Sequence, residues 1–357
     1  MLSDNLEIPR DTLNFLCEFL GSEPTIAPIG NGNTNTVFRA KFREYSAILK
    51  LPVASLLDSV ADIQLPVQRN LLEQWALSQF KSTSPSTEVP AVLHSSALKP
   101  CFVMNDISPS ISWHELSVEQ RQNGVISVIR FCEDCRNRVV PTMPKPLEVV
   151  SSKMSSVIEG LSFVYPRTYQ SPVYQTANAD AEAKYNSARY KLQCSPDVRH
   201  VNELATNHYS SVSRNLIHGD LHNLSVLYSN SKFHIIDPEF CRIGCSSFDL
   251  GVFMAHVILF EAANTRDNIS KDEFSEILNF LYPEFNSIND FLEEEPRYLA
   301  YVKMFCLNEL FAKLVGPVPS YWLTKITGVK QNIAIELVSD YLIQEAREWC
   351  SISQISQ

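Results

Sequence analysis

Apolar and polar positions divide the chain into a strand-rich beginning and a longer, mainly helical remainder. A helical spacing of apolar residues comes first, followed by short runs rich in β-branched and aromatic residues around a second helical stretch. The predicted helices of this part are Arg10–Leu20 and Arg69–Phe80, and the predicted strands are Tyr45–Lys50, Pro90–His94 and Cys101–Met104. This order is typical of an α+β domain.

Helical spacing dominates after a connection at Asn105–Ser110, which we interpret as a hinge. The segment Tyr165–Ala177 holds three tyrosines and two prolines and predicts a loop. The predicted helices of this part are Val118–Cys135, Pro146–Gly160, Leu250–Ala263, Lys271–Leu281, Tyr298–Leu314 and Asn332–Trp349.

One β-hairpin signal interrupts the helical part and carries acidic residues. The apolar runs Val226–Tyr228 and Phe233–Ile236 flank a polar turn. This pattern places Asp220 on the first arm of the hairpin and Asp237 on the second, so we expect their carboxylates at neighbouring ends of adjacent strands. One carboxylate can deprotonate a hydroxyl while the other, with Glu239, holds a hard divalent cation. Phosphoryl transfer from Mg·ATP needs this arrangement.

Asp, Gly and Pro also occupy ordinary turns for backbone reasons. The ordered set is more specific than its members: His218-Gly219-Asp220, an apolar strand, Asp237-Pro238-Glu239 and Phe248–Gly251. Together these segments predict an active site of the kinase type.

A glycine-containing turn near the N-terminus supplies a matching phosphate site. Glycines let backbone amides approach an anion closely. Lys50 would place a positive charge on the phosphates, with Glu73 as its partner, while Arg69 could pair with Glu73 across one helical turn. The turn contains Gly30, Gly32, Asn33 and Asn35.

The chain resembles the methylthioribose kinases, within the aminoglycoside phosphotransferase and choline kinase-like superfamily. The segments that carry the resemblance are the glycine turn with Val37-Phe38, His218–His222, Ser225, Asp237–Phe240 and Phe248–Gly251. Most of the superfamily has a metal-binding asparagine where this chain has Ser225, so the serine indicates the methylthioribose kinase branch. The resemblance implies a bilobal protein-kinase-like fold, with a β-rich N-lobe at residues 1–105 and a mainly helical C-lobe at residues 106–357.

The same resemblance implies ATP and Mg²⁺ as cofactors and a hydroxyl of a small metabolite as acceptor. Asp220 would be the catalytic base, and Asp237 and Glu239 would hold Mg²⁺. The expected nucleotide-binding residues are Gly30, Gly32, Asn33, Asn35, Lys50, Glu73, Met104, Asp106 and Ser225. The expected acceptor-side residues are Trp113, His222, Ala312 and Lys313.

Some of these residues also fit structural roles. Trp113 fits a buried packing position and His222 a structural loop position. Asp249 fits either a helix cap near Leu250 or, by the resemblance, a brace of the catalytic loop.

The chain departs from the family on the acceptor side. The family places two arginines after a Glu-Leu step, where this chain has Ala312 and Lys313. Alanine donates no hydrogen bond, and lysine lacks the planar fork of arginine. We therefore expect an acceptor other than methylthioribose. Methylthioribose itself, an aminoglycoside or nucleoside-type compound and an amino alcohol all stay open.

A second interpretation is a kinase-fold protein that binds a nucleotide or a partner without catalysis. Retention of the full acidic and basic set argues against it, because binding alone does not need all five of Lys50, Glu73, Asp220, Asp237 and Glu239.

Charge and cysteine content narrow the setting. A net charge of −10 argues against nucleic acid or an anionic membrane as partner. Nine cysteines and no signal peptide at Met1–Arg10 predict reduced thiols and a cytoplasmic location. We expect a monomer or homodimer. Cys132 and Cys135 are expected to be buried thiols. The apolar run Val252–Phe260 is too short to span a bilayer and predicts a buried helix.

Overall fold

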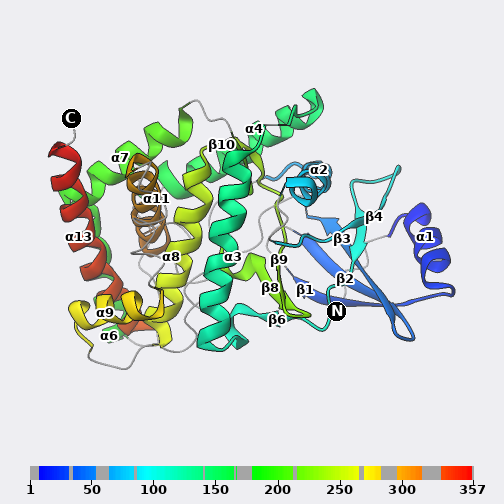
Figure 1. Ribbon diagram of the computed structural model, residues 1–357, viewed down its shortest axis with the longest axis horizontal. Coiled ribbons are helices and arrows are strands. Elements are labelled where there is room, and N and C mark those ends of the chain that lie inside the picture. Colours follow the sequence, from blue (N-terminus) through cyan, green and yellow to red (C-terminus); the bar gives the residue numbers. More distant parts are fainter. Residues whose placement is uncertain are drawn as a thin grey trace.

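The computed structural model describes residues 8–31, 35–53, 64–83, 87–139, 141–164, 166, 179–211, 215–264, 269–282, 296–315 and 331–355. A β-sheet with its helices occupies one end of the molecule, and a larger helical region fills the other (Figure 1). This is the expected α+β arrangement, with a β-rich N-terminal region and a mainly helical remainder. Gly32, Asn33 and nearly all of the predicted loop Tyr165–Ala177 lie outside the described residues.

The N-terminal region is an antiparallel sheet with the strand order β1-β2-β3-β5-β4. A helix covers each of its faces. The elements are α1 (Arg10–Leu20), β1 (Thr25–Asn31), β2 (Asn35–Phe42), β3 (Tyr45–Pro52), α2 (Arg69–Thr83), β4 (Val92–Ser95) and β5 (Phe102–Asn105).

The central strand β3 is buried on both faces, and its alternation decides where Lys50 points. Leu49 and Leu51 pack in the cluster that contains Leu16 of α1. Ile48, on the opposite face, packs with Leu77 of α2. Successive side chains of a strand alternate between faces, so Lys50 is directed toward α2.

The C-terminal region combines short strands with long helices. Its strands form a β6-β8-β9 sheet and a separate β7–β10 pair. The strands are β6 (Ile111–Ser112), β7 (Asn215–Ile217), β8 (Val226–Ser229), β9 (Lys232–Ile235) and β10 (Arg242–Gly244). The α-helices are α3 (Val118–Asn137), α4 (Lys145–Glu159), α6 (Ala179–Cys194), α7 (Pro196–Ser210), α8 (Ser246–Asn264), α9 (Lys271–Leu281), α11 (Pro296–Val315) and α13 (Gln331–Ile355).

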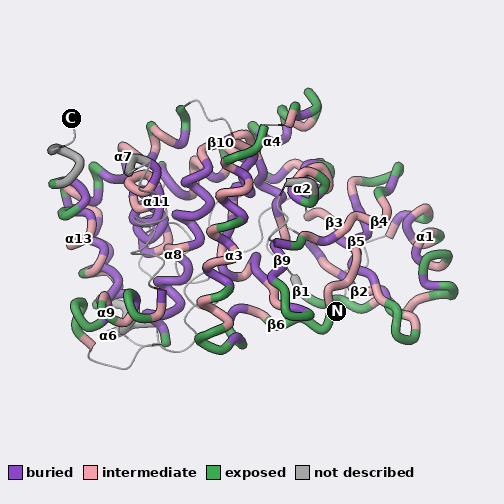
Figure 2. The backbone as a smooth tube through the Cα atoms, in the orientation of Figure 1, coloured by how far each residue is buried: buried purple, intermediate pink, exposed green. Residues whose placement is uncertain are grey.

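Helix α8 forms the centre of the helical region, as its buried trace in Figure 2 shows. Among the described helices, α8 is the one long and apolar enough to cross a membrane. However, 94% of its apolar 18-residue stretch is buried inside the fold. Gly251 lets α11 approach closely, since a Cβ there would lie 2.6 Å from Cβ of Phe305. The expected buried helix is confirmed, and it begins at Ser246 instead of Leu250.

Two predictions about elements need correction. Helices α6 and α7 were not predicted at all. The hairpin exists as β8 and β9, joined at Asn230 and Ser231, which both have positive φ. Asp220, however, lies before this hairpin, in the segment that follows β7.

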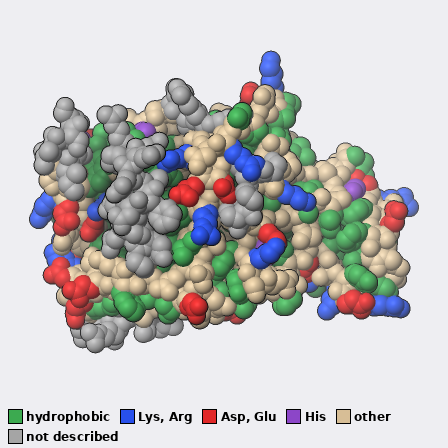
Figure 3. Space-filling view, in the orientation of Figure 1, with side chains coloured by type: hydrophobic (Ala, Val, Ile, Leu, Met, Phe, Trp, Pro, Cys, Tyr) green, Lys and Arg blue, Asp and Glu red, His purple; other side chains and the backbone are tan. Residues whose placement is uncertain are grey.

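The cysteines and surface charges complete the description. All nine cysteines are free, and Cys132 and Cys135 are buried in the core on α3, where burial raises the pKa of both thiols. On the face shown in Figure 3, acidic and basic side chains are interspersed wherever the surface is described.

Candidate active site

The segment after β7 has a backbone conformation that depends on glycine. Gly219 has φ +86°, in the left-handed region, and a Cβ there would lie 2.1 Å from the carbonyl oxygen of Phe240. Every other residue type would push the two segments apart. Gly219 therefore brings the Asp220 segment against the segment that carries Asp237 and Glu239.

Asp249 braces the same segment from inside α8. Its carboxylate accepts hydrogen bonds from the backbone N–H of His218 (2.6 Å) and of Gly219 (2.9 Å). Asp249 is the fourth residue of α8 and so lies past the position of a helix cap. The geometry therefore supports the role of a brace for the catalytic segment. His218 is fully buried, and its Nε2 lies 2.8 Å from the carbonyl oxygen of Ile236. Burial lowers the pKa of His218 to about 4.

Asp220 combines partial exposure with an unusual electrostatic setting. Its side chain is 26% exposed. Desolvation by the surrounding protein raises the pKa of Asp220 to about 7; the Lys313 ammonium opposes this rise and Glu309 adds to it. A carboxylate with a pKa near neutrality is suited to accept a proton from a hydroxyl.

Lys50 is held between two carboxylates. Its Nζ donates to both Glu73 oxygens (2.6 and 2.8 Å) and to Oδ1 of Asp237 (2.6 Å). The side chains of Lys50 and Glu73 are 2% and 0% exposed, whereas that of Asp237 is 46% exposed. Burial alone would lower the pKa of Lys50, but the carboxylates of Asp237 and Glu73 hold it above its ordinary value.

Glu239 binds other residues than those that hold Lys50. Its Oε2 accepts hydrogen bonds from Nδ2 of Asn35 (2.8 Å) and from Nε of Arg69 (2.9 Å). Arg69 thus pairs with Glu239, and its suggested pairing with Glu73 is wrong.

The residues present fit a magnesium ion that is completed by a nucleotide. Mg²⁺ prefers one or two carboxylates together with substrate phosphates and water. Asp237 offers an exposed carboxylate from a backbone with φ +64°, and Glu239 stands two residues later. Within the described part of the chain, no group of three or more His, Cys, Asp or Glu side chains is suited to hold a metal by itself.

The predicted nucleotide residues near the hinge are structurally engaged. Met104 lies on β5, opposite Ile48 of β3, and is 7% exposed. Asp106 accepts a hydrogen bond from Nε of Arg39 (2.7 Å) and another from the backbone N–H of Ser108 (3.0 Å). Asp106 therefore helps to fix the connection after β5. Ser225 is buried, with its Oγ 3.2 Å from Nδ1 of His222.

The acceptor side contains a chain of polar side chains. It joins the predicted residues Lys313 and His222 to two that sequence reasoning missed, Glu309 and His256. Lys313 Nζ lies 3.0 Å from Oε1 of Glu309, one turn earlier on α11, and Nε2 of His256 lies 3.6 Å from the same oxygen. The His256 ring stacks on His222, whose Nε2 lies 3.9 Å from Oδ2 of Asp220. The spacing Glu309–Lys313 was the available signal for an i,i+4 pair. Ala312, the other expected acceptor residue, is buried.

The Glu309 carboxylate is kept charged by its neighbours. Burial would raise its pKa, but the Lys313 ammonium and His256 lower the pKa of Glu309 to about 2.

Trp113 lies in the core. It is 0% exposed, meets Phe253 edge to face at 5.4 Å, and would be 2.8 Å from a Cβ at Gly124. This geometry supports the packing alternative and leaves no indole face for an acceptor.

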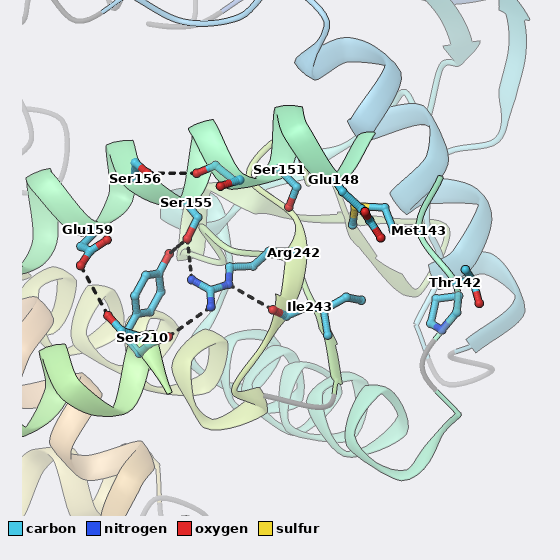
Figure 4. Close-up of a pocket in the computed structure, with 13 residues that line it drawn as sticks. Thr142, Met143, Glu148, Ser151, Ser155, Ser156, Glu159, Ser210, Arg242 and Ile243 are labelled. Carbon is cyan, nitrogen blue, oxygen red and sulfur yellow. Dashed lines mark hydrogen bonds between the residues drawn. The ribbon is translucent and has the colours of Figure 1, made fainter. Parts of the chain in front are cut away.

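A groove of about 670 Å³ lies between α4, the end of α7 and β10 (Figure 4), and none of the predicted site residues line it. Arg242 at its floor is already engaged: Nη2 donates to the carbonyl of Tyr209 (3.1 Å), Nη1 to Oγ of Ser155, and the guanidinium lies over the Tyr209 ring. The groove is therefore separate from the carboxylates described above.

No protein-family model matches the chain. Among curated proteins, it is 27% identical over 273 residues to a methylthioribose kinase of Exiguobacterium sibiricum, which covers 73% of this chain and 68% of that protein. It is 28% identical over 245 residues to a methylthioribose kinase of Bacillus cereus, which covers 65% of this chain. The chain spans only 59% of the length of the Bacillus protein.

Solved structures of similar shape include a spectinomycin phosphotransferase bound to ADP and spectinomycin, with 12% identity, 96% of this chain covered, 99% of that chain covered and a TM-score of 0.49. A choline kinase of Streptococcus pneumoniae has 12% identity, covers 95% of this chain and 98% of its own, and has a TM-score of 0.46. At these scores, neither brings its substrate or activity to this chain.

The relatives found by sequence are named as kinases, in agreement with the predicted phosphotransferase. The predicted resemblance is confirmed: the chain is similar in sequence to the methylthioribose kinases.

Proposed function

We propose that the protein is an ATP-dependent small-molecule kinase that transfers the γ-phosphoryl group of Mg·ATP to a hydroxyl of a small acceptor. The observation that carries this proposal is the position of Lys50, whose ammonium binds Glu73 and Asp237 together. Kinases need such a lysine–glutamate pair beside a metal-binding aspartate. The similarity to proteins named methylthioribose kinases supports it.

Each side chain has a distinct task in this proposal. Asp220 orients the acceptor hydroxyl and accepts its proton. Lys50, positioned by Glu73, contacts the nucleotide phosphates together with Gly30 and Asn35. Asp237 and Glu239 hold Mg²⁺, which supplies neutralisation of the phosphate charge when bound.

The remaining nucleotide contacts come from the hinge. Met104 and Asp106 flank the expected adenine position, and the lobe boundary falls between residues 105 and 106. Ser225 lies behind the phosphates, where it fixes His222.

The proposed acceptor differs from methylthioribose. Ala312 is buried and Lys313 is bound to Glu309, so this wall has no pair of arginine forks for a polar sugar. Buried hydroxyls that lose their donors cost about 1–3 kcal/mol each. We place the acceptor pocket between the Asp220 segment and α11, and the protein in the cytoplasm as a monomer or homodimer.

An acceptor screen tests the proposal. Purified protein is incubated with Mg·ATP and methylthioribose, an aminoglycoside, nucleosides or amino alcohols, and ATP consumption is followed by mass spectrometry of the product. The expected result is a phosphorylated product from an acceptor other than methylthioribose. Efficient turnover of methylthioribose would refute the acceptor assignment, and the absence of any Mg-dependent nucleotide binding would refute the kinase assignment.

A further inference from the structure

Arg69 is a fully buried arginine to which the kinase motifs give no role. It is 0% exposed and lies at the start of α2. Its Nε donates to Oε2 of Glu239 (2.9 Å) and its Nη1 to the carbonyl oxygen of Pro66 (3.2 Å). Burying a guanidinium is costly unless its hydrogen bonds are well made, so these contacts define the position of the side chain.

The hydrogen bonds from Asn35 and Arg69 reach the same oxygen of Glu239. Asn35 of β2 donates to Oε2 at 2.8 Å, and Arg69 donates to Oε2 at 2.9 Å. Glu239 is 5% exposed, so its carboxylate has little freedom to rotate. One oxygen is anchored by the N-terminal region, and this sets the orientation of the other.

Helix α2 connects this anchor with the phosphate lysine. Arg69 and Glu73 lie one helical turn apart and therefore on the same face of α2. Glu73 binds Lys50, and Arg69 binds Glu239. One helix thus positions the cation expected at the phosphates and a carboxylate expected at the metal.

We propose that Arg69, with Asn35, is a positioning residue that orients Glu239 toward Mg²⁺ and so couples α2 to the metal site. The proposal rests on the proposed kinase function. Residues that hydrogen-bond a metal-binding carboxylate fix its geometry, and their loss typically lowers metal affinity by about 10–100-fold.

Binding of ADP, measured by calorimetry across a Mg²⁺ titration and again in EDTA, tests this role without turnover. For Arg69→Met we expect Mg-dependent ADP binding to need about 10–100-fold more Mg²⁺, with binding in EDTA unchanged. Arg69→Lys keeps the charge without the fork and should fall between Arg69→Met and wild type. Arg121→Met is the matched control, because Arg121 forms a comparable ion pair with Glu261 (3.1 Å) away from the site. It should keep the wild-type Mg²⁺ dependence.

A second variant keeps the test decisive if Arg69→Met does not fold. Asn35→Ala removes the other hydrogen bond to Oε2 and leaves α2 intact; it should also raise the Mg²⁺ requirement. Wild-type Mg²⁺ dependence in either folded variant would overturn the role of Arg69 and Asn35. Wild-type protein that binds no ADP at any Mg²⁺ concentration would instead overturn the proposed kinase function.

Discussion

Two lysines flank the site, one buried and one partly buried, and they are held in different ways. Lys50, on the nucleotide side, binds Glu73 of α2 and Asp237 of the C-terminal region, so its partners come from two other elements. Lys313, on the acceptor side, binds Glu309 one turn earlier on its own helix. The Lys50 contacts depend on the whole fold, whereas the Lys313 pair is formed within α11.

This difference explains why sequence motifs predict the nucleotide side of the site better than the acceptor side. A cation that must meet carboxylates from distant segments constrains the sequence in several places at once, and those places form the motif set. An i,i+4 pair constrains one helix only. The acceptor side can therefore change locally while the nucleotide side keeps its geometry.

The largest expected effect is at the carboxylate between the two sides. Asp220→Asn removes the proposed base at almost unchanged volume and should lower kcat by about a hundredfold to ten-thousandfold. Calorimetry should show ADP binding close to wild type, because Asp220 does not contact Lys50. Near-normal turnover on the true acceptor would show that Asp220 is not the base.

Lys50→Met tests the nucleotide side, where the partners of the lysine come from distant segments of the chain. It leaves Glu73, 0% exposed, without its cation. Breaking a buried pair by removing one partner costs about 3–5 kcal/mol of the free energy of unfolding. Urea unfolding measures the loss. Lys191→Met is the control, since it breaks an exposed pair with Asp340 and should cost at most about 1 kcal/mol.

The local pair should be easier to replace. Lys313→Met alone should destabilise less than Lys50→Met, because 15% of the Lys313 side chain is exposed against 2% for Lys50. Adding Glu309→Gln should recover most of that loss, since uncharged replacements of a buried pair are often neutral. Unfolding curves of the single and double variants decide this. If the variant with both Lys313→Met and Glu309→Gln were less stable than Lys313→Met alone, the two residues would not form a pair that can be replaced independently of the rest of the site.

The smallest expected effect is a shift in pH dependence. Asp220 must be ionised to accept a proton, so kcat/KM should rise with pH through about 7, the pKa to which burial raises this group. Lys313 opposes that rise in pKa, so Lys313→Met should move the acidic limb to higher pH and lower activity severalfold on it. Glu309→Gln should move the limb to lower pH. The groups that set this pKa are Lys313, Glu309, Glu239 and Asp249.

Much of the fold follows from local signals in the sequence. The bounds of α1 and α9 are those predicted, because each helix has a clear apolar stripe and a distinct start, such as the Ser270 capping box of α9. Helix α6 was missed because its buried face includes Ala188 and Arg189, which do not stand out as apolar. Helix α7 begins with a Ser195 cap and a proline at its first position, a start signal that was present and not used.

For the site, the contacts between segments that are distant in the sequence were the hardest to predict. The pairing of Lys50 with Glu73 was predicted, because a kinase site requires it. The pairing of Arg69 with Glu239 was not, since 170 residues separate them and no local rule joins them. His256 interrupts an apolar helix for a reason that becomes visible only with Glu309 beside it.

The central position of α8 has a consequence for biosynthesis. Its apolar surface is completed by α11, which meets it so closely that Gly251 has no room for a side chain. The ribosome makes α11 and α13 after α8, so the nascent chain carries an uncovered apolar helix until residues 296–355 are synthesised. Partly folded chains with such exposed surface aggregate readily. Recombinant fragments that stop before α11 should therefore collect in inclusion bodies, and chaperone demand should peak late in translation.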